Sequence, residues 1–174
     1  MRLIKSSFEI LEQESGIQGI YKQIERAGRT CYKSEDRITE DSAKKFVNMI
    51  KDRQHTAMLE HGTVYLTFEG LGEAYITLVS KYKSNKYSLV NEYKNYNCRG
   101  LNSDPYINKS FITTNYRVLY ENNWLDDLKY LCEPTEYHEK RITVKFICDR
   151  GVSHELVRHR VFSFAQESTR QMAA

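Results

Sequence analysis

The chain has few of the residues and segments that mark membrane, secreted and fibrous proteins. It contains two prolines, one tryptophan and eight glycines in 174 residues. No apolar run approaches the roughly 18 residues of a membrane-spanning helix. The N-terminus also has no hydrophobic stretch of the kind that a signal peptide needs. We therefore predict a cytoplasmic protein with no membrane partner.

The cysteines are too sparse for a disulfide framework or a zinc ribbon. Cys31, Cys98, Cys132 and Cys148 are widely separated, and no two of them form a Cys-x-x-Cys pair. Small disulfide-rich domains and structural zinc sites need denser or closer spacing. We expect reduced thiols and no structural metal.

The charge balance excludes little by itself. A formal net charge of +3 is too small to indicate a nucleic-acid-binding protein. Thirteen tyrosines among scattered lysines nevertheless leave one alternative open, a surface on which the bases of a single strand stack. Hydrophobic residues at 40% and charged residues at 28% are ordinary for a soluble globular protein. We predict a single domain over residues 1–174, which is long enough to bury a core.

Periodicity predicts a mixture of helices and strands. Apolar residues recurring every three or four positions predict helices at 16–28, 39–53, 71–82, 114–120, 124–131 and 149–157, with Gly28 ending the first. Runs rich in β-branched and aromatic residues predict strands at 1–5, 63–68, 87–93 and 141–148. We expect an α+β fold with a small, mainly antiparallel sheet, which includes the strands at 63–68 and 141–148 and is flanked by helices.

Some of these elements carry more specific expectations. We expect Thr39 to cap the second helix, with Ala43, Phe46, Val47 and Ile50 on its buried face. The helix at 71–82 has an apolar stripe that predicts core packing, formed by Leu71, Ala74, Tyr75, Leu78, Val79 and Tyr82. The strand at 141–148 places Ile142, Val144, Phe146 and Cys148 on one face. The Asn-, Lys-, Tyr- and Ser-rich interval around 84–110 is predicted to be an insertion that forms a surface loop or lid around one short strand.

The chemistry is concentrated near the end of the chain. Arg158, His159 and Arg160 stand in a row, and Ser163 and a polar run from 166 to 170 follow. Arginine presents a planar fork of donors to phosphate oxygens, and hydroxyl groups can fill the remaining acceptor sites. A solvated basic helix end is the simplest alternative for three such residues. Apolar neighbours at 157, 161, 162 and 164 instead favour cations held against a core.

The run from Arg158 to Arg170 resembles the signature of the flavin-dependent thymidylate synthases. Two further stretches resemble landmarks of that family in the same order along the chain: residues 28–32 (Gly-Arg-Thr-Cys-Tyr) and residues 55–61 (His-Thr-Ala-Met-Leu-Glu-His), the latter leading into the apolar run 63–68. The resemblance implies the family's fold and the reductive methylation of dUMP to dTMP. It also implies FAD as cofactor, with NADPH and methylenetetrahydrofolate as co-substrates.

The resemblance also assigns ligand contacts to particular residues. It places dUMP against Glu155, Leu156, Val157, Arg158, Gln166, Glu167, Ser168, Thr169 and Arg170. It places FAD against His55, Arg158, His159, Arg160 and Gln166. A complete relative is a homotetramer in which the flavin lies between subunits, so the resemblance implies a homo-oligomer.

Several positions depart from the family pattern. Ala57, Ala165 and Gln171 replace a hydroxyl, an amide and an aromatic residue that many members carry. In complete members a C-terminal half follows the signature and brings the arginine that activates the pyrimidine. We therefore assign no catalytic residue to this chain, and we expect it to correspond to the N-terminal portion of such an enzyme.

Other interpretations of the same residues remain open. One is a truncated, non-catalytic remnant of the family that binds a nucleotide or another subunit; a basic, Tyr-rich nucleic-acid-binding module is a further one. A serine nucleophile at Ser168 is disfavoured because no Gly-x-Ser-x-Gly motif surrounds it. Zinc at His55 and His61 is disfavoured because their spacing is not that of a His-Glu-x-x-His motif and no third ligand follows.

Overall fold

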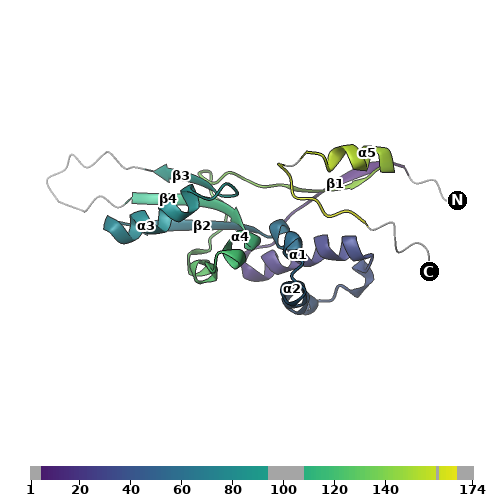
Figure 1. Cartoon of the computed structure of the whole chain (residues 1–174), viewed down its shortest axis with the longest axis horizontal. Helices are drawn as coiled ribbons and strands as arrows, with labels where there is room; N and C mark the ends of the chain where they lie inside the picture. Colours follow the sequence, from purple (N-terminus) through teal and green to yellow (C-terminus); the bar gives the residue numbers. More distant parts are fainter. Residues whose placement is uncertain (1–4, 94–107, 160, 168–174) are drawn as a thin grey trace. The chain divides into compact units, whose positions relative to one another are not determined.

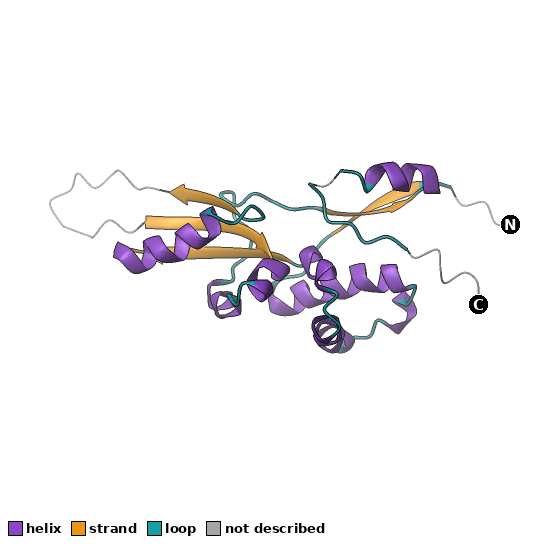
Figure 2. Cartoon of the chain, in the orientation of Figure 1, coloured by secondary structure: helices purple, strands orange, loops and turns teal. Residues whose placement is uncertain are grey.

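The computed structural model describes residues 5–93, 108–159 and 161–167, and the chain forms two compact units. The first unit comprises residues 1–61 and 141–174, and the second comprises residues 62–140. Figure 1 traces the elements in chain order, and Figure 2 colours the helices and strands. Among the described residues, no helix has the length and apolar character needed to cross a membrane.

The first unit contains a strand pair and a group of helices. Its elements are β1 (Ser7–Leu11), α1 (Gly16–Tyr32), η1 (Glu35–Arg37), α2 (Ser42–Asp52), η2 (Thr56–His61), β5 (Thr143–Ile147) and α5 (Arg150–Leu156). Most of the strand predicted at 1–5 lies outside the described residues, and the first described strand begins at Ser7. Asp149 caps α5, because its side chain accepts a hydrogen bond from the Val152 amide at 3.0 Å.

The second unit is built on a three-stranded sheet. Its elements are β2 (Thr63–Gly70), α3 (Gly72–Lys83), β3 (Leu89–Tyr93), β4 (Asn108–Asn115), α4 (Tyr116–Glu121) and η3 (Leu125–Tyr130). The strand order is β2-β4-β3 with antiparallel pairing throughout, and Figure 2 shows these strands side by side. Asn115 ends β4 and caps α4 by accepting a hydrogen bond from the Val118 amide at 3.0 Å.

The α+β class is confirmed, but the prediction of one sheet containing both strong strands is wrong. β2 belongs to the three-stranded sheet, whereas β5 pairs with β1 in a separate two-stranded ribbon. The central strand β4 was not predicted, and it begins inside the interval assigned to an insertion. Residues 110–115 of β4 are all buried, so both faces of the strand meet other groups and the sequence there does not alternate. Residues 84–93 of that interval are described and include β3, whereas residues 94–107 lie outside the described residues.

Helix α1 continues past its predicted end at Gly28, and Gly28 lies inside the helix, where it allows close packing against α2. A Cβ atom at Gly28 would lie 2.5 Å from two ring atoms of Phe46, so α2 can approach α1 only where no side chain intervenes. Residues Arg29 to Tyr32, which follow the predicted helix end, are helical. The buried face predicted for α2 is confirmed at Ala43, Phe46, Val47 and Ile50.

A buried carboxylate joins the two helices. Glu25 is 1% exposed, and it accepts hydrogen bonds from Arg29 Nη2 at 3.0 Å and from Ser42 Oγ at 2.8 Å. The Arg29 guanidinium also lies 4.7 Å from the centre of the Phe46 ring. The predicted cap at Thr39 is wrong as a side-chain cap, since its backbone N–H and C=O bind the Ser42 hydroxyl.

The apolar stripe of α3 is only partly buried. Tyr75, Val79 and Tyr82 face the core as predicted, whereas Leu71 and Ala74 are exposed. Tyr82 donates a hydrogen bond to Asp127 at 2.6 Å, which fixes η3 against the helix. Burial and the neighbouring carboxylate raise the pKa of Tyr82 far above its ordinary value, so the phenol remains a donor.

The outer edge of β2 is covered by the segment 131–138. The Cys132 amide donates to the Tyr65 carbonyl at 3.0 Å, and His138 Nε2 lies 3.2 Å from the Leu66 carbonyl. The other ring nitrogen of His138 accepts from the Thr135 amide at 3.1 Å. Both contacts suit a neutral imidazole protonated on Nε2, and His138 is only 5% exposed.

We expect this histidine to make the stability of the fold depend on pH. Burial lowers the pKa of His138 below its ordinary 6.5, so the unfolded chain binds a proton more readily than the folded chain. The contribution is complete above pH 6.5 and is lost as the pH falls toward the folded pKa. Burial lowers the pKa of His61 as well, which adds a contribution of the same sign.

Urea unfolding followed between pH 8 and pH 5 measures this effect. The His138→Gln variant should show a shallower loss of unfolding free energy than the parent chain. His154→Gln, at an exposed position of α5, serves as the matched control and should leave the slope unchanged. An unaltered slope in His138→Gln would contradict the assignment.

The ribbon of β1 and β5 exposes its apolar face. Phe8 lies opposite Phe146 and Ile10 lies opposite Val144, so the predicted alternation of β5 is confirmed. Phe8, Ile10 and Phe146 are nevertheless 70%, 58% and 55% exposed. A two-stranded ribbon with no covered face is only marginally stable. We therefore expect other protein surface to cover this face in the functional form of the protein.

Candidate ligand-binding site

The described residues in the first half of the signature, 158, 159, 161 and 162, lie at the surface. The Arg158 side chain is 74% exposed, and its Nη1 donates to Glu155 at 3.1 Å, three residues earlier on α5. His159 is also exposed. Arg158 therefore presents most of its donors to solvent.

The expectation that apolar neighbours hold these cations against a core is wrong for the described chain. Val157, Val161, Phe162 and Phe164 are 37%, 88%, 64% and 37% exposed. Helix α5 has seven residues and none of them is buried. The interleaved apolar residues therefore form a second exposed apolar stretch, in addition to the ribbon face.

The second half of the signature, residues 163–167, is anchored to the helices of the first unit. Ser163 Oγ donates to Glu60 at 2.7 Å. The Gln166 side-chain amide donates to Ser153 Oγ at 2.8 Å, and Glu167 forms an ion pair with Lys33. This segment is fixed by side chains from α5, from η2 and from the end of α1.

Buried and partly buried groups meet the anchored segment. Burial raises the pKa of the Cys31 thiol, and the Gln166 backbone N–H opposes that shift by donating to the sulfur. Burial lowers the pKa of His61, which a hydrogen bond to the Phe164 backbone and the nearby Glu60 carboxylate partly oppose. Within the described residues, the buried His61 Nε2 has no hydrogen-bond partner. A buried polar atom without a partner marks a place where a ligand or a water molecule would be stabilised.

A second pair of side chains joins the two upstream stretches. The Tyr32 hydroxyl lies 2.6 Å from His55 Nδ1, and the two rings are inclined by 25° with centroids 6.4 Å apart. Tyr32 is the last residue of α1, and His55 lies between α2 and η2. Residues 28–33, 55–61 and 163–167 thus form one group in the first unit, which we call the signature cluster.

The predicted contacts divide between this cluster and α5, and nearly all of them are exposed. Gln166, Glu167 and His55 are exposed members of the cluster, whereas Glu155, Val157, Arg158 and His159 are exposed on or beside α5 and Leu156 is half-buried. The remaining predicted contacts lie outside the described residues, namely Arg160, Ser168, Thr169 and Arg170. Tyr32, Lys33 and Glu60 were not predicted as site residues, although the second of the upstream stretches includes Glu60 and the first ends at Tyr32.

The donors in and beside the cluster fit the chemistry of a flavin dinucleotide. Arg158, His159 and His55 are exposed N–H donors, and such groups suit pyrophosphate and ring-carbonyl oxygens. The unpartnered His61 Nε2 adds a polar atom that a bound group can satisfy. Arg158, His159 and His55 would hold FAD through its acceptor oxygens, whereas His61 Nε2 would accept a hydrogen bond from a donor group. In the part of the chain that the structure describes, no three His, Cys, Asp or Glu side chains are grouped to hold a metal ion.

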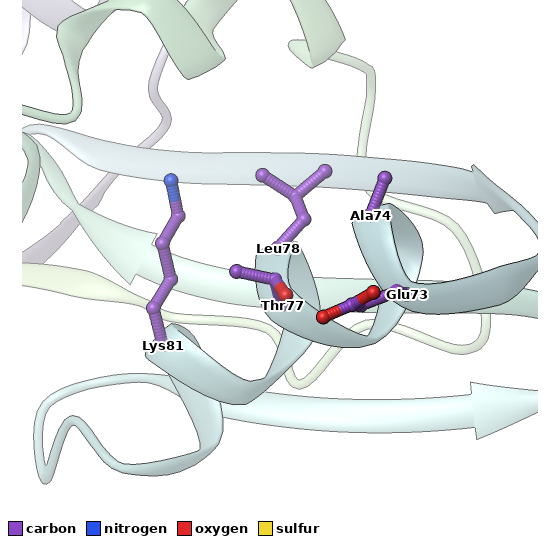
Figure 3. A pocket seen from close by; sticks show the side chains of 5 residues that line it. All are labelled: Glu73, Ala74, Thr77, Leu78 and Lys81. Atoms are coloured by element: carbon purple, nitrogen blue, oxygen red, sulfur yellow. The ribbon is translucent and has the colours of Figure 1, made fainter.

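A shallow depression on α3 offers a different location. It has a volume of about 480 Å³ and is lined by Glu73, Ala74, Thr77, Leu78 and Lys81. Figure 3 shows Ala74, Leu78 and Lys81 pointing to the same side of the helix. The Lys81 amine is paired with Asp127 at 2.5 Å, so the depression gains little from its charge. No predicted site residue lines it.

Comparison with known proteins adds no assignment. No protein-family model, no curated protein and no solved structure matches the chain.

Proposed function

We propose that the chain is a flavin-dependent thymidylate synthase, or the N-terminal portion of one, that acts in the cytoplasm on dUMP. The observation that carries the proposal is the signature cluster. Three stretches that resemble landmarks of this family contact one another through Ser163 and Glu60, Cys31 and Gln166, and Tyr32 and His55, and the first two of these contacts join stretches about a hundred residues or more apart in the sequence. If the similarity of the three stretches were accidental, we would not expect them to contact one another in the folded chain.

In this proposal the protein binds and orients the reactants. FAD, reduced by NADPH, supplies the reducing equivalent for methylation of dUMP by methylenetetrahydrofolate. Arg158 binds phosphate, and Glu155 and Gln166 hold the nucleotide beside it. Holding two reactants in a fixed geometry is itself a large part of catalysis.

Titration with FAD, followed by the flavin absorbance and fluorescence, tests the proposal. The proposal predicts saturable binding with a shifted flavin spectrum. Competition with dUMP separates a shared site from an unrelated one. A chain that is folded by circular dichroism and leaves the FAD spectrum unchanged at saturating cofactor would contradict the proposal.

A non-catalytic protein of the same family, which binds a nucleotide or another subunit, is the second candidate. The observation that favours it is the exposure of the first half of the signature, because Arg158 faces solvent beside Val161 and Phe162. It predicts dUMP binding without turnover when FAD, NADPH and methylenetetrahydrofolate are all supplied. Formation of dTMP would exclude it.

We also propose that the protein is a homo-oligomer and that the ribbon face formed by Phe8, Ile10, Val144 and Phe146 is buried in the assembly. An apolar face that is flanked by polar surface is typical of interfaces between proteins. Two copies that pair symmetrically along β1, with the two-fold axis at the middle of the strand, would place Glu9 against Glu9. The same pairing along β5 would place Lys145 against Lys145, so like charges disfavour both of these pairings.

Analytical ultracentrifugation over a range of protein concentrations measures this association. Phe8→Asp should shift the equilibrium toward monomer by at least about tenfold, because it places a charge in an apolar contact. Ile76→Asp on α3, where the parent side chain is 63% exposed, is the matched control and should leave the equilibrium unchanged. Equal sedimentation of Phe8→Asp and the parent chain would exclude the ribbon face.

A further inference from the structure

Tyr32 and His55 meet at the ends of two packed helices. Contacts between α1 and α2 run in the same order along both: Ser42 touches Glu25, Phe46 touches Arg29, and His55 follows α2 where Tyr32 ends α1. The packing of the helices therefore brings the phenol and the imidazole together.

The backbone on both sides of this contact is fixed. At the end of α1, Lys33 has φ 49°, and the Ser34 amide donates to the Arg29 carbonyl at 3.0 Å. At the end of α2, Gln54 has φ 58°, and the His55 amide donates to the Ile50 carbonyl at 3.0 Å. Each is a Schellman arrangement, in which a left-handed residue closes the helix and orients the next residue. His55 thus leaves α2 in a defined direction.

Which group donates in this contact depends on the tautomer of the imidazole, and the short separation favours the hydroxyl as the donor. Hydroxyl donors commonly lie 2.5–3.0 Å from their acceptors, whereas N–H donors to oxygen lie at 2.7–3.2 Å. The distance of 2.6 Å therefore fits the Tyr32 hydroxyl donating to an unprotonated His55 Nδ1. In a neutral imidazole, an acceptor at one nitrogen fixes the proton on the other. His55 then carries its proton on Nε2, and the ring is exposed.

We propose that Tyr32 is a positioning residue, which holds His55 in one orientation and one tautomer so that Nε2–H donates to an oxygen acceptor of the bound ligand. This inference rests on the proposed function for the identity of that ligand, which is FAD. The fixed tautomer itself does not depend on any ligand. Without the Tyr32 hydroxyl, the ring would rotate and would divide its proton between both nitrogens.

Nitrogen-15 NMR of the histidine side chains tests the tautomer directly. At pH 8 the parent chain should show His55 protonated on Nε2, whereas Tyr32→Phe should show a mixture of tautomers. Tyr87→Phe, at an exposed tyrosine of the other unit, is the matched control. A His55 tautomer that does not differ between the parent chain and Tyr32→Phe would overturn the proposal.

The affinity for FAD tests the link to the ligand. Tyr32→Phe and His55→Ala should each weaken FAD binding by about tenfold, as expected for one lost hydrogen bond. The double variant should be no weaker than His55→Ala alone, because Tyr32 acts through the histidine. Additive losses would show that Tyr32 has a separate role. If the parent chain binds no FAD, the proposed function fails, and so does the claim that His55 donates to FAD. The NMR result still decides whether Tyr32 fixes the tautomer of His55.

Discussion

Replacement of Arg29 by alanine should lower the free energy of unfolding by about 3 kcal/mol, because it leaves the buried Glu25 carboxylate without its cation. Glu25 is 1% exposed, and after the change the Ser42 hydroxyl, a neutral donor, would still bind it. The cation–π contact with Phe46 would also be lost. Urea unfolding at neutral pH measures the change.

Two further variants show whether the buried charge is the cause. Arg26→Ala removes an exposed cation from the same helix and should change stability by less than about 0.5 kcal/mol. The pair Glu25→Leu with Arg29→Leu removes both charges and should recover much of the loss, since apolar replacement of a buried ion pair is often close to neutral. A double variant as unstable as Arg29→Ala would show that packing, and not charge, dominates.

Arg158→Ala should weaken dUMP binding by about a hundredfold, because hydrogen bonds from a cation to phosphate contribute roughly 1.5–3 kcal/mol. Arg158 is 74% exposed and pairs with a carboxylate that is itself 68% exposed, so the substitution should leave stability nearly unchanged. Isothermal titration calorimetry with dUMP gives the affinity.

Arg117→Ala is the matched control for this measurement. Arg117 and Glu121 form a similar ion pair on α4, four residues apart, in the other unit. Its removal should leave dUMP affinity within a factor of about two of the parent value. Equal losses in Arg117→Ala and Arg158→Ala would indicate nonspecific attraction between a cationic surface and a phosphate, as in the nucleic-acid-binding alternative.

The elements with a clear period were predictable from the sequence. The apolar spacing of α2 and the β-branched run of β2 predicted the correct elements. Apolar periodicity did not predict β4, because a central strand with both faces buried has no alternation of apolar and polar residues. It also failed at Gly28, because the need for glycine arises from Phe46 on another helix.

Burial and side-chain contacts were less predictable, because they depend on what packs against each face. The alternation of β5 was correct, yet Phe146 is 55% exposed, since a period shows which face is apolar and not what covers it. The same limit explains the error at Val161 and Phe162. The contacts of Ser163 with Glu60 and of Tyr32 with His55 join residues far apart in sequence, so only the three-dimensional structure reveals them.

The central claim is that the signature cluster and the adjacent end of α5 form the ligand site. Amide chemical-shift mapping during titration with dUMP, and then with FAD, tests it most directly. The account predicts that the perturbed amides group at 28–33, 55–61, 155–159 and 163–167. Perturbations confined to the depression on α3, between Glu73 and Lys81, or spread evenly over the surface lysines would contradict it.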